Sequence, residues 1–307
     1  IVVAGDGIDA QDRVFPAGAW LSSQGATVAT TVLSDAPILE GHTAIAVSVS
    51  GSVATVVTQR GAVFQVRADG TLVATFGAGG IFRTTSDWNV RRAVRLPNGA
   101  VLLAGSAPDD GSCGGRRTML AARLTDRGTL DASFGTAGVR RLCLTTEQPS
   151  TSASVETFQG TEALGLVADT ASTFGTADDR YFFAGFRTSA AGTAEPVVVE
   201  LRGDGRVEQG FGNSILYAGV TIGYDADDAD RAFVDVDLMS GVLHLTTADG
   251  VFYRMNLAGQ RIAEYGAQGR APFVPAATVQ DVAPSGPEHA IVLEKVGNGY
   301  RVVRRCR

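Results

Sequence analysis

The chain has 307 residues, of which 45% are hydrophobic and 19% are charged, so it is long enough to bury a substantial core. Its net charge of −6 excludes the strongly basic surface that is typical of nucleic-acid-binding proteins. No apolar run approaches the roughly 20 residues that a transmembrane helix requires. The 38 glycines and the many short runs of Val, Ala and Thr favour strands and turns over helices.

The first repeated unit covers residues 1–39 and is incomplete. Residues 1–5 ("IVVAG") align with the second strand of a later unit ("VLLAG"), and residues 19–32 align with that unit's third and fourth strands. A unit that starts at its second strand leaves the innermost edge of its sheet bare. We therefore expect either a segment upstream of Ile1 or a strand from a partner to complete this sheet.

Four whole units follow, and the second of them shows the pattern most clearly. In it, "VRRAVRLPNG" alternates between apolar and polar residues and ends in a turn. "AVLLAGSA" is predicted to be an apolar strand and "TMLAARLTDRG" a half-buried strand. "TLDASFGTAGVRRLCL" follows as a bent fourth strand. Alternation that ends in Asn-Gly and Asp-Gly turns is typical of β-hairpins. The predicted whole units cover approximately residues 40–86, 87–146, 147–222 and 223–275.

An aromatic residue followed by glycine recurs at an equivalent place in each whole unit. The spacings between the pairs are 58, 77 and 54 residues, and the longest of them contains a loop insertion. The aromatic side chain is predicted to pack between neighbouring sheets, and the glycine to let the strand bulge or bend. The pairs are Phe76-Gly77, Phe134-Gly135, Phe211-Gly212 and Tyr265-Gly266.

Residues 276–307 supply three further strands and lack a fourth. Units of four antiparallel strands in repetition are the mark of a β-propeller. The sequence therefore predicts one all-β propeller domain over residues 1–307, built from six blade-like units, with five as the alternative.

The stretches "LPNGAVLLAG" (96–105) and "LAARLTDRGTLDASFGTAGV" (120–139) resemble the bacterial delta-sixty-repeat proteins. The resemblance is good over residues 90–140 and weaker over 60–84 and 197–213. It implies a β-propeller-like fold and an exported protein, in the periplasm, on the cell surface or secreted. The family pattern defines no shared catalytic residues, so the resemblance assigns none here.

Motifs that carry chemistry are sparse. The three histidines, His42, His244 and His289, lie far apart and fit neither HExxH nor a Cys/His zinc spacing. No G-x-S-x-G sequence marks a hydrolase nucleophile. The catalytic residues, if there are any, are therefore unknown from the sequence, and no cofactor is predicted apart from an optional Ca²⁺ ion.

The candidate Ca²⁺ site is the acidic stretch "YDADDADR", which contains Asp225, Asp227, Asp228 and Asp230. Hard cations bind several oxygen ligands, and closely spaced carboxylates supply them. The stretch departs from the usual calcium loop because Ala229 takes a ligand position and no glycine follows. A solvated acidic loop is the favoured alternative.

A candidate ligand platform lies where Trp88 precedes Arg91 and Arg92. A tryptophan at the junction of a loop and a strand stacks on a ligand or caps the sheet edge, and both interpretations remain open.

The chain contains three cysteines, and a disulfide is predicted between Cys113 and Cys143. Cys113 lies in the loop between the second and third strands of its unit, and Cys143 lies near the end of the fourth. In an antiparallel sheet these two places share an edge, which brings the residues within bridging distance. Cys306 belongs to another unit and is left free or intermolecular. The alternative is three reduced cysteines in a cytosolic protein.

Two functions are compatible with this pattern. The first is an exported, non-catalytic binding or structural module whose loops on one face contact a protein or glycan partner. The alternative is a secreted propeller enzyme, a hydrolase or lyase, with acid and base residues drawn from several blades.

Overall fold

The structure is a computed structural model of the 307-residue chain. It describes all residues except 1, 22–26, 34–36, 85–86, 110–116, 145–159, 171–177, 189–193, 213–219, 223–231, 248, 263, 265–269, 273–277, 285–288, 297–298 and 307. The described chain forms two compact units. Unit 1 comprises residues 1–108 and 120–141, and unit 2 comprises residues 109–119 and 142–307.

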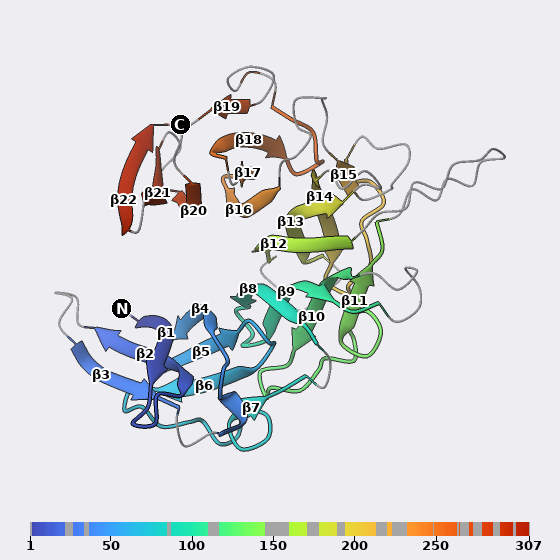
Figure 1. Ribbon diagram of the computed structural model, residues 1–307. Coiled ribbons are helices and arrows are strands. Elements are labelled where there is room, and N and C mark those ends of the chain that lie inside the picture. The colour runs from blue at the N-terminus through green and yellow to red at the C-terminus, as the bar shows by residue number, and fades with distance from the viewer. Residues whose placement is uncertain are drawn as a thin grey trace. The chain divides into compact units, whose positions relative to one another are not determined.

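Unit 1 holds three antiparallel sheets, apart from the first two residues of β10 and the last residue of β11, which belong to unit 2 (Figure 1). Sheet 1 contains β1 (Val2–Ile8), β2 (Val14–Leu21) and β3 (Thr27–Val32). A short 3-10 helix, η1 (Pro37–Leu39), leads into sheet 2. Sheet 2 contains β4 (Ala44–Ser50), β5 (Val53–Thr58), β6 (Val63–Arg67) and β7 (Ile81–Phe82). Sheet 3 contains β8 (Asn89–Arg95), β9 (Val101–Ala107), β10 (Thr118–Leu124) and β11 (Val139–Leu142).

Unit 2 holds three further sheets of the same kind. Sheet 4 contains β12 (Gly160–Asp169), β13 (Arg180–Thr188), β14 (Ala194–Arg202) and β15 (Val220–Ile222). Sheet 5 contains β16 (Phe233–Met239), β17 (Val242–Thr247), β18 (Val251–Asn256) and β19 (Arg270–Pro272). Sheet 6 contains β20 (Thr278–Pro284), β21 (His289–Val296) and β22 (Gly299–Cys306).

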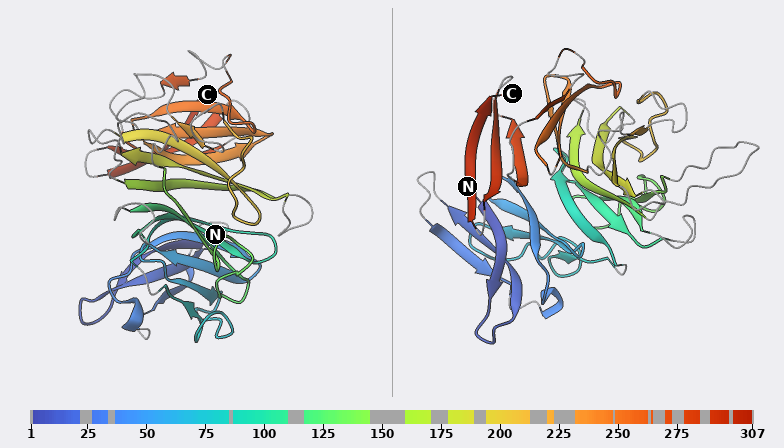
Figure 2. Two further views of the ribbon diagram at one scale, coloured as in Figure 1. Left: turned by 90° about the vertical axis from the view of Figure 1, so that its right-hand side faces the viewer. Right: turned by 45° about the horizontal axis from the view of Figure 1, so that its top comes forward.

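In every sheet the strands neighbour one another in chain order. The right view of Figure 2 shows the three red strands of sheet 6 side by side. Counted over the residues that the structure describes, four of the sheets have four strands, and sheets 1 and 6 have three. A four-stranded antiparallel meander is the blade of a β-propeller. The predicted class is therefore confirmed: the protein is all-β and is built from β-propeller blades.

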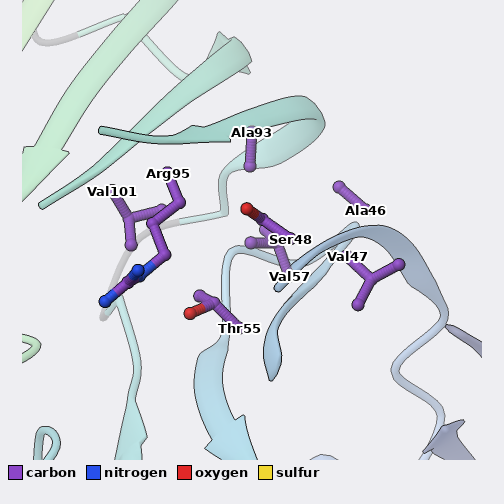
Figure 3. Close-up of a pocket in the computed structure, with 8 residues that line it drawn as sticks. All are labelled: Ala46, Val47, Ser48, Thr55, Val57, Ala93, Arg95 and Val101. Atoms are coloured by element: carbon purple, nitrogen blue, oxygen red, sulfur yellow. The ribbon is translucent and has the colours of Figure 1, made fainter. Parts of the chain in front are cut away.

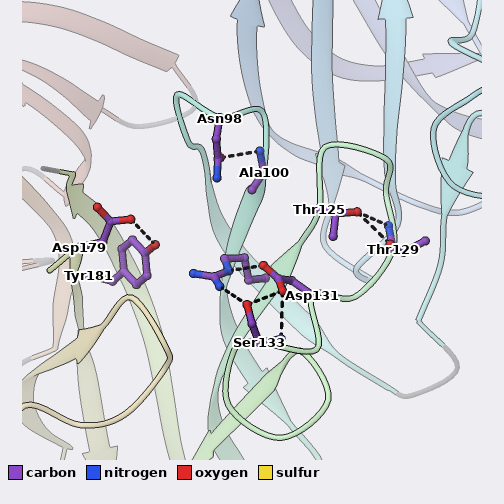
Figure 4. Close-up of polar contacts among 9 residues, drawn as sticks. Asn98, Ala100, Thr125, Thr129, Asp131, Ser133, Asp179 and Tyr181 are labelled. Carbon is purple, nitrogen blue, oxygen red and sulfur yellow. Dashed lines mark hydrogen bonds and ion pairs between the residues drawn. The ribbon is translucent and has the colours of Figure 1, made fainter. Parts of the chain in front are cut away.

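The third strand of each four-stranded sheet ends in the same turn. In sheet 2 the Arg67 amide donates to the Thr71 carbonyl and the Gly70 amide donates to the Arg67 carbonyl, both at 2.9 Å. The turns that begin at Thr125, Arg202 and Asn256 repeat both hydrogen bonds. Figure 4 shows the sheet 3 copy, where the Thr125 and Thr129 hydroxyls also lie 2.9 Å apart. The repeat read from the sequence is thus a repeat of backbone geometry.

The recurring phenylalanines are core residues, as predicted. Phe76, Phe134 and Phe211 are each 2% exposed or less. Phe76 packs with residues of sheets 2 and 3, including Val63 and Val101. The Phe211 ring centroid lies 5.7 Å from that of Phe182, in the cluster that joins sheets 4 and 5. Tyr265 lies outside the described residues.

The glycine after the aromatic residue forms a corner that docks on the next sheet. The Gly77 amide of sheet 2 donates to the Arg127 carbonyl in the turn of sheet 3, at 2.8 Å. The equivalent Gly212 amide donates to the Ala258 carbonyl in the turn of sheet 5, at 2.7 Å. Gly77 has φ +59°, and a Cβ there would lie 2.4 Å from the Ile81 carbonyl oxygen. The predicted bend is therefore a tight turn in which glycine has room and other residues do not.

The register shifts of the described strands lie elsewhere: one is between β2 and β3 of sheet 1, and five are β-bulges on the first strands of sheets 2 to 6. There the pairing with the second strand skips one residue, which bends the strand and redirects side chains. In unit 2 the bulge of β16 approaches β12 so closely that a Cβ on Gly165 would lie 2.8 Å from the Val236 amide nitrogen. The skipped residues are Ile45, Arg91, Leu164, Val234 and Gln280.

The Gly77 corner gives a direct test of the docking contact. Gly77→Ala is expected to destabilise the protein by about 2–4 kcal/mol, because the methyl group meets backbone atoms in a left-handed conformation. Gly51 has the same φ of +59° with nothing within 4 Å of a Cβ, so Gly51→Ala should cost only about 1 kcal/mol. Urea denaturation of both variants measures the difference. Equal losses would contradict a tightly docked corner.

A buried histidine in unit 1 links stability to pH. His42 is 5% exposed, and its Nδ1 lies 3.0 Å from the Thr58 hydroxyl, which is itself paired with the backbone of Ala62. Burial lowers the pKa of His42 below its ordinary value, and the nearby charges of Arg60 and Arg83 lower it further. The folded protein therefore holds this imidazole in its neutral form.

Stability should consequently fall as the pH drops below about 6.5, the ordinary pKa of histidine. In that range the unfolded chain binds a proton that the folded chain does not, so protons favour unfolding. Above that range the contribution of His42 is fully present. Denaturant titrations between pH 8 and pH 5 should show the fall, and His42→Gln should reduce it. An unchanged pH dependence in that variant would assign the effect to other groups.

Candidate binding surface on the first strands

Within each unit, the first strands of successive sheets pack next to one another. β1 packs against β4 and β4 against β8 in unit 1, while β12 packs against β16 and β16 against β20 in unit 2. The Asp6 carboxylate on β1 accepts a hydrogen bond of 3.1 Å from the Ala44 amide on β4. Side chains from different sheets therefore meet along these strands.

The charges on these strands differ between the units, apart from Asp6 on β1, which is acidic although β1 lies in unit 1. β8 carries only arginines, at positions 91, 92 and 95, and β4 carries no charge. β12, β16 and β20 carry only acidic residues: Glu162, Asp169, Asp235, Asp237 and Asp281. Unit 1 has 11 basic and 9 acidic residues, a net charge of +2, whereas unit 2 has 15 and 23, a net charge of −8. Charge of one sign along a strand favours a partner of the opposite sign.

The bulge of β8 presents two of the residues that the sequence singled out. Arg91 is the skipped residue of the bulge, Arg92 follows it, and both are half-buried. The Arg92 guanidinium donates a hydrogen bond of 3.3 Å to the Arg91 carbonyl. A bulge redirects side chains from the regular alternation of a strand. Both arginines thus lie on the first strand of sheet 3, beside Arg95, which the sequence reasoning missed.

Trp88, the third predicted residue, is 6% exposed. It belongs to the apolar cluster with Val57, Val63 and Phe76, in the core between sheets 2 and 3. This position shows the ring in a packing role, which leaves little of its surface for a stacked ligand. A direct ligand contact by Trp88 stays a prediction.

A small hollow lies between sheets 2 and 3, next to Arg95 (Figure 3). Its volume is about 10 Å³, which is room for one water molecule. β4, β5, β8 and β9 all contribute to its wall. The lining residues are Ala46, Val47, Ser48, Thr55, Val57, Ala93, Arg95 and Val101.

A second polar cluster, on sheet 3, resembles part of a catalytic constellation but serves the fold (Figure 4). The buried Arg123 guanidinium lies 2.9 Å from the Asp131 carboxylate and donates to the Ser133 hydroxyl at 3.0 Å. Ser133 in turn donates to Asp131 at 2.7 Å. Burial alone would raise the pKa of Asp131, but the hydrogen bonds from Ser133 and the charge of Arg123 lower it. A carboxylate with a lowered pKa is a poor base for activating a serine. The cluster therefore stabilises the chain just before the core residue Phe134.

The remaining predicted site residues lie largely outside the described chain. This is true of Cys113 and of Asp225, Asp227, Asp228 and Asp230. Cys143 is described and is disulfide-bonded. In the described part of the chain, no group of three or more His, Cys, Asp or Glu side chains could hold a metal ion.

Among the described residues, no helix has the length and apolar character needed to cross a membrane.

Known proteins similar to this chain are found through structure. No protein-family model matches the sequence, and no curated protein is detectably similar to it. BamB from Moraxella catarrhalis is 14% identical, with a TM-score of 0.48 over 99% of this chain and 85% of BamB. YCF48 from Cyanidioschyzon merolae is 13% identical, with a TM-score of 0.46 over 96% of this chain and 76% of YCF48. A chain of the Mitotic Checkpoint Complex is 13% identical, with a TM-score of 0.49 over 99% of this chain and 84% of that chain.

The predicted pairing of Cys113 with Cys143 is tested by peptide mapping under non-reducing conditions. We expect one linked peptide pair that contains both residues, because the second-to-third strand loop and the end of the fourth strand share an edge. Closing a loop of about 30 residues should contribute roughly 3–4 kcal/mol, so Cys113→Ser should lower stability by that amount. Cys306→Ser is the matched control and should leave stability unchanged. An unlinked Cys113 peptide from oxidised protein would contradict the pairing.

Proposed function

We propose that this chain is an exported, non-catalytic β-propeller module that binds a protein partner. Its contacts come from loops on one face and from the first strand of sheet 3. The observation that carries the proposal is the placement of Arg91, Arg92 and Arg95 together on β8. An arginine strand of this kind suits recognition of an acidic partner, because guanidinium groups bind carboxylates through paired hydrogen bonds.

The hollow beside these arginines supports binding in preference to catalysis. Pockets that enclose small-molecule substrates have volumes of about 300–1,000 Å³. The hollow at Arg95 has about 10 Å³ and is lined mainly by aliphatic side chains. It suits the tip of one side chain from a partner whose remaining contacts lie on the surface.

Two observations support export. The sequence resembles bacterial delta-sixty-repeat proteins over residues 90–140, and that resemblance implies an exported protein. Cys143 is disulfide-bonded, and structural disulfides persist in oxidising compartments outside the cytosol.

Charge reversal on β8 tests the binding function. The double variant Arg91→Glu and Arg92→Glu should lose the partner that wild-type protein captures from the exported fraction of its source cells. Direct binding of that partner after purification should weaken by about tenfold or more. A matched double variant reverses Arg67 and Arg206, which are exposed and lie in turns of sheets 2 and 4. It should retain the partner.

Two results would overturn the proposal. One is equal loss of binding in both double variants, which would indicate unspecific attraction between charges. The other is robust turnover in a screen against glycans, esters and peptides, which would replace the binding module with the enzyme alternative.

A further inference from the structure

The hollow between sheets 2 and 3 contains three polar side chains in an otherwise aliphatic wall. Arg95 comes from β8, Ser48 from β4 and Thr55 from β5. Figure 3 shows the Arg95 guanidinium and the Thr55 hydroxyl on the same side of the hollow. All three side chains carry hydrogen-bond donors, and Arg95 adds a permanent positive charge.

Arg95 differs from several other arginines in having no carboxylate partner in the described part of the chain, a property that it shares with Arg140. Arg123, Arg180 and Arg187 each form an ion pair with a carboxylate within 3 Å. Among the described residues, Arg95 forms no ion pair, and its buried Nε has no hydrogen-bond partner. A buried polar atom without a partner costs free energy that a suitable acceptor would recover.

The strands around the hollow contain no acidic side chain that could accept a hydrogen bond from Arg95. β4, β5, β8 and β9 contain three arginines and neither Asp nor Glu. Asp126 lies in the next turn, where a Cβ on Gly99 would be 3.1 Å from the Asp126 Cβ and 3.3 Å from Arg95 Nη2. It nevertheless makes no ion pair with Arg95 in the described structure. The positive charge of the hollow is therefore not neutralised from within these strands.

The hydroxyl groups complete a donor set for an anion. Thr55 is 2% exposed, and its Oγ1 accepts a hydrogen bond of 3.4 Å from the Gln65 amide, which leaves its proton available to donate. Ser48 is half-buried and precedes Val49, an exposed apolar residue that is 46% accessible. A carboxylate accepts several hydrogen bonds, and charge-assisted bonds to arginine are the strong ones.

We propose that Arg95, Ser48 and Thr55 form a subsite that receives the carboxylate of an Asp or Glu side chain from a protein partner. The inference rests on the proposed binding function and names the chemistry that the partner must present. The volume of about 10 Å³ has room for one atom the size of a water oxygen, such as a single carboxylate oxygen, and excludes a metabolite. The rest of the partner segment lies over Val49 and along the arginines of β8.

The test uses fluorescein-labelled hexaglutamate and fluorescence anisotropy on the full chain. Arg95→Gln should weaken binding about tenfold, because it removes one charge-assisted interaction. Arg95→Lys should retain part of the affinity, and Ser48→Ala and Thr55→Val should each cause smaller losses. Arg67→Gln removes an exposed arginine of sheet 2 as the matched control and should bind like the wild type. Thermal unfolding of each variant verifies that it is folded.

The NMR resonance of the Arg95 Nε–Hε group reports binding at this side chain in the wild-type protein, without any substitution. It should shift when hexaglutamate is added and stay in place when hexalysine is added. Wild-type affinity in Arg95→Gln, or an equal loss in Arg67→Gln, would overturn the subsite. If inorganic phosphate produces the same shift and displaces hexaglutamate at equal concentration, the hollow is instead a site for a free anion. A natural partner that requires Arg91 and Arg92 but binds Arg95→Gln normally would refute this inference and leave the proposed function intact.

Discussion

The repeated architecture depends on one contact between neighbouring sheets. The glycine after a buried aromatic residue donates its amide proton to a carbonyl in the turn of the next sheet, as Gly77 does to Arg127 and Gly212 to Ala258. The contact is tight on both sides, since a Cβ on Gly128 would lie 2.7 Å from the Gly77 nitrogen and 2.8 Å from the Phe76 ring. The aromatic ring fills the core between sheets while the glycine aligns their turns. This pairing explains why the two residues recur together.

Once the sheets are aligned, the first strands become the place where side chains from different sheets meet. Five of these strands carry a β-bulge at an equivalent position, and the residue there varies from isoleucine to arginine. The same β-bulge thus recurs in successive sheets, and the side chain at the bulge differs from sheet to sheet. On β8 the result is an arginine strand, and on β12 and β16 it is a set of carboxylates. Variation at a constant geometry is how a repeat fold acquires a particular binding surface.

Several buried ion pairs elsewhere lie within the sheets and support the fold. The Arg180 guanidinium binds both oxygens of Glu200, which is 1% exposed, and also the Leu257 carbonyl in the turn of sheet 5. Arg123 plays a similar part with Asp131 in sheet 3. Such pairs stabilise the structure only as complete sets, because a lone buried charge is costly. Arg95 has no carboxylate partner among the described residues and borders a hollow, and the two observations together make this hollow the candidate for recognition.

The sequence by itself determined the all-β class, the order of strands in each sheet, the equivalent turns and the burial of Phe76, Phe134 and Phe211. These follow from local signals, since alternation, turn residues and a recurring aromatic residue act within a few neighbouring positions. Only the tertiary structure decided that the bulges fall on the first strands, that Trp88 packs in the core and that Arg95 borders a hollow with Ser48 and Thr55. The bulges depend on the register of each first strand against the second, and the Arg95 hollow depends on contacts between β4 and β8, which lie more than 30 residues apart along the chain. No local pattern of residues is diagnostic of either feature.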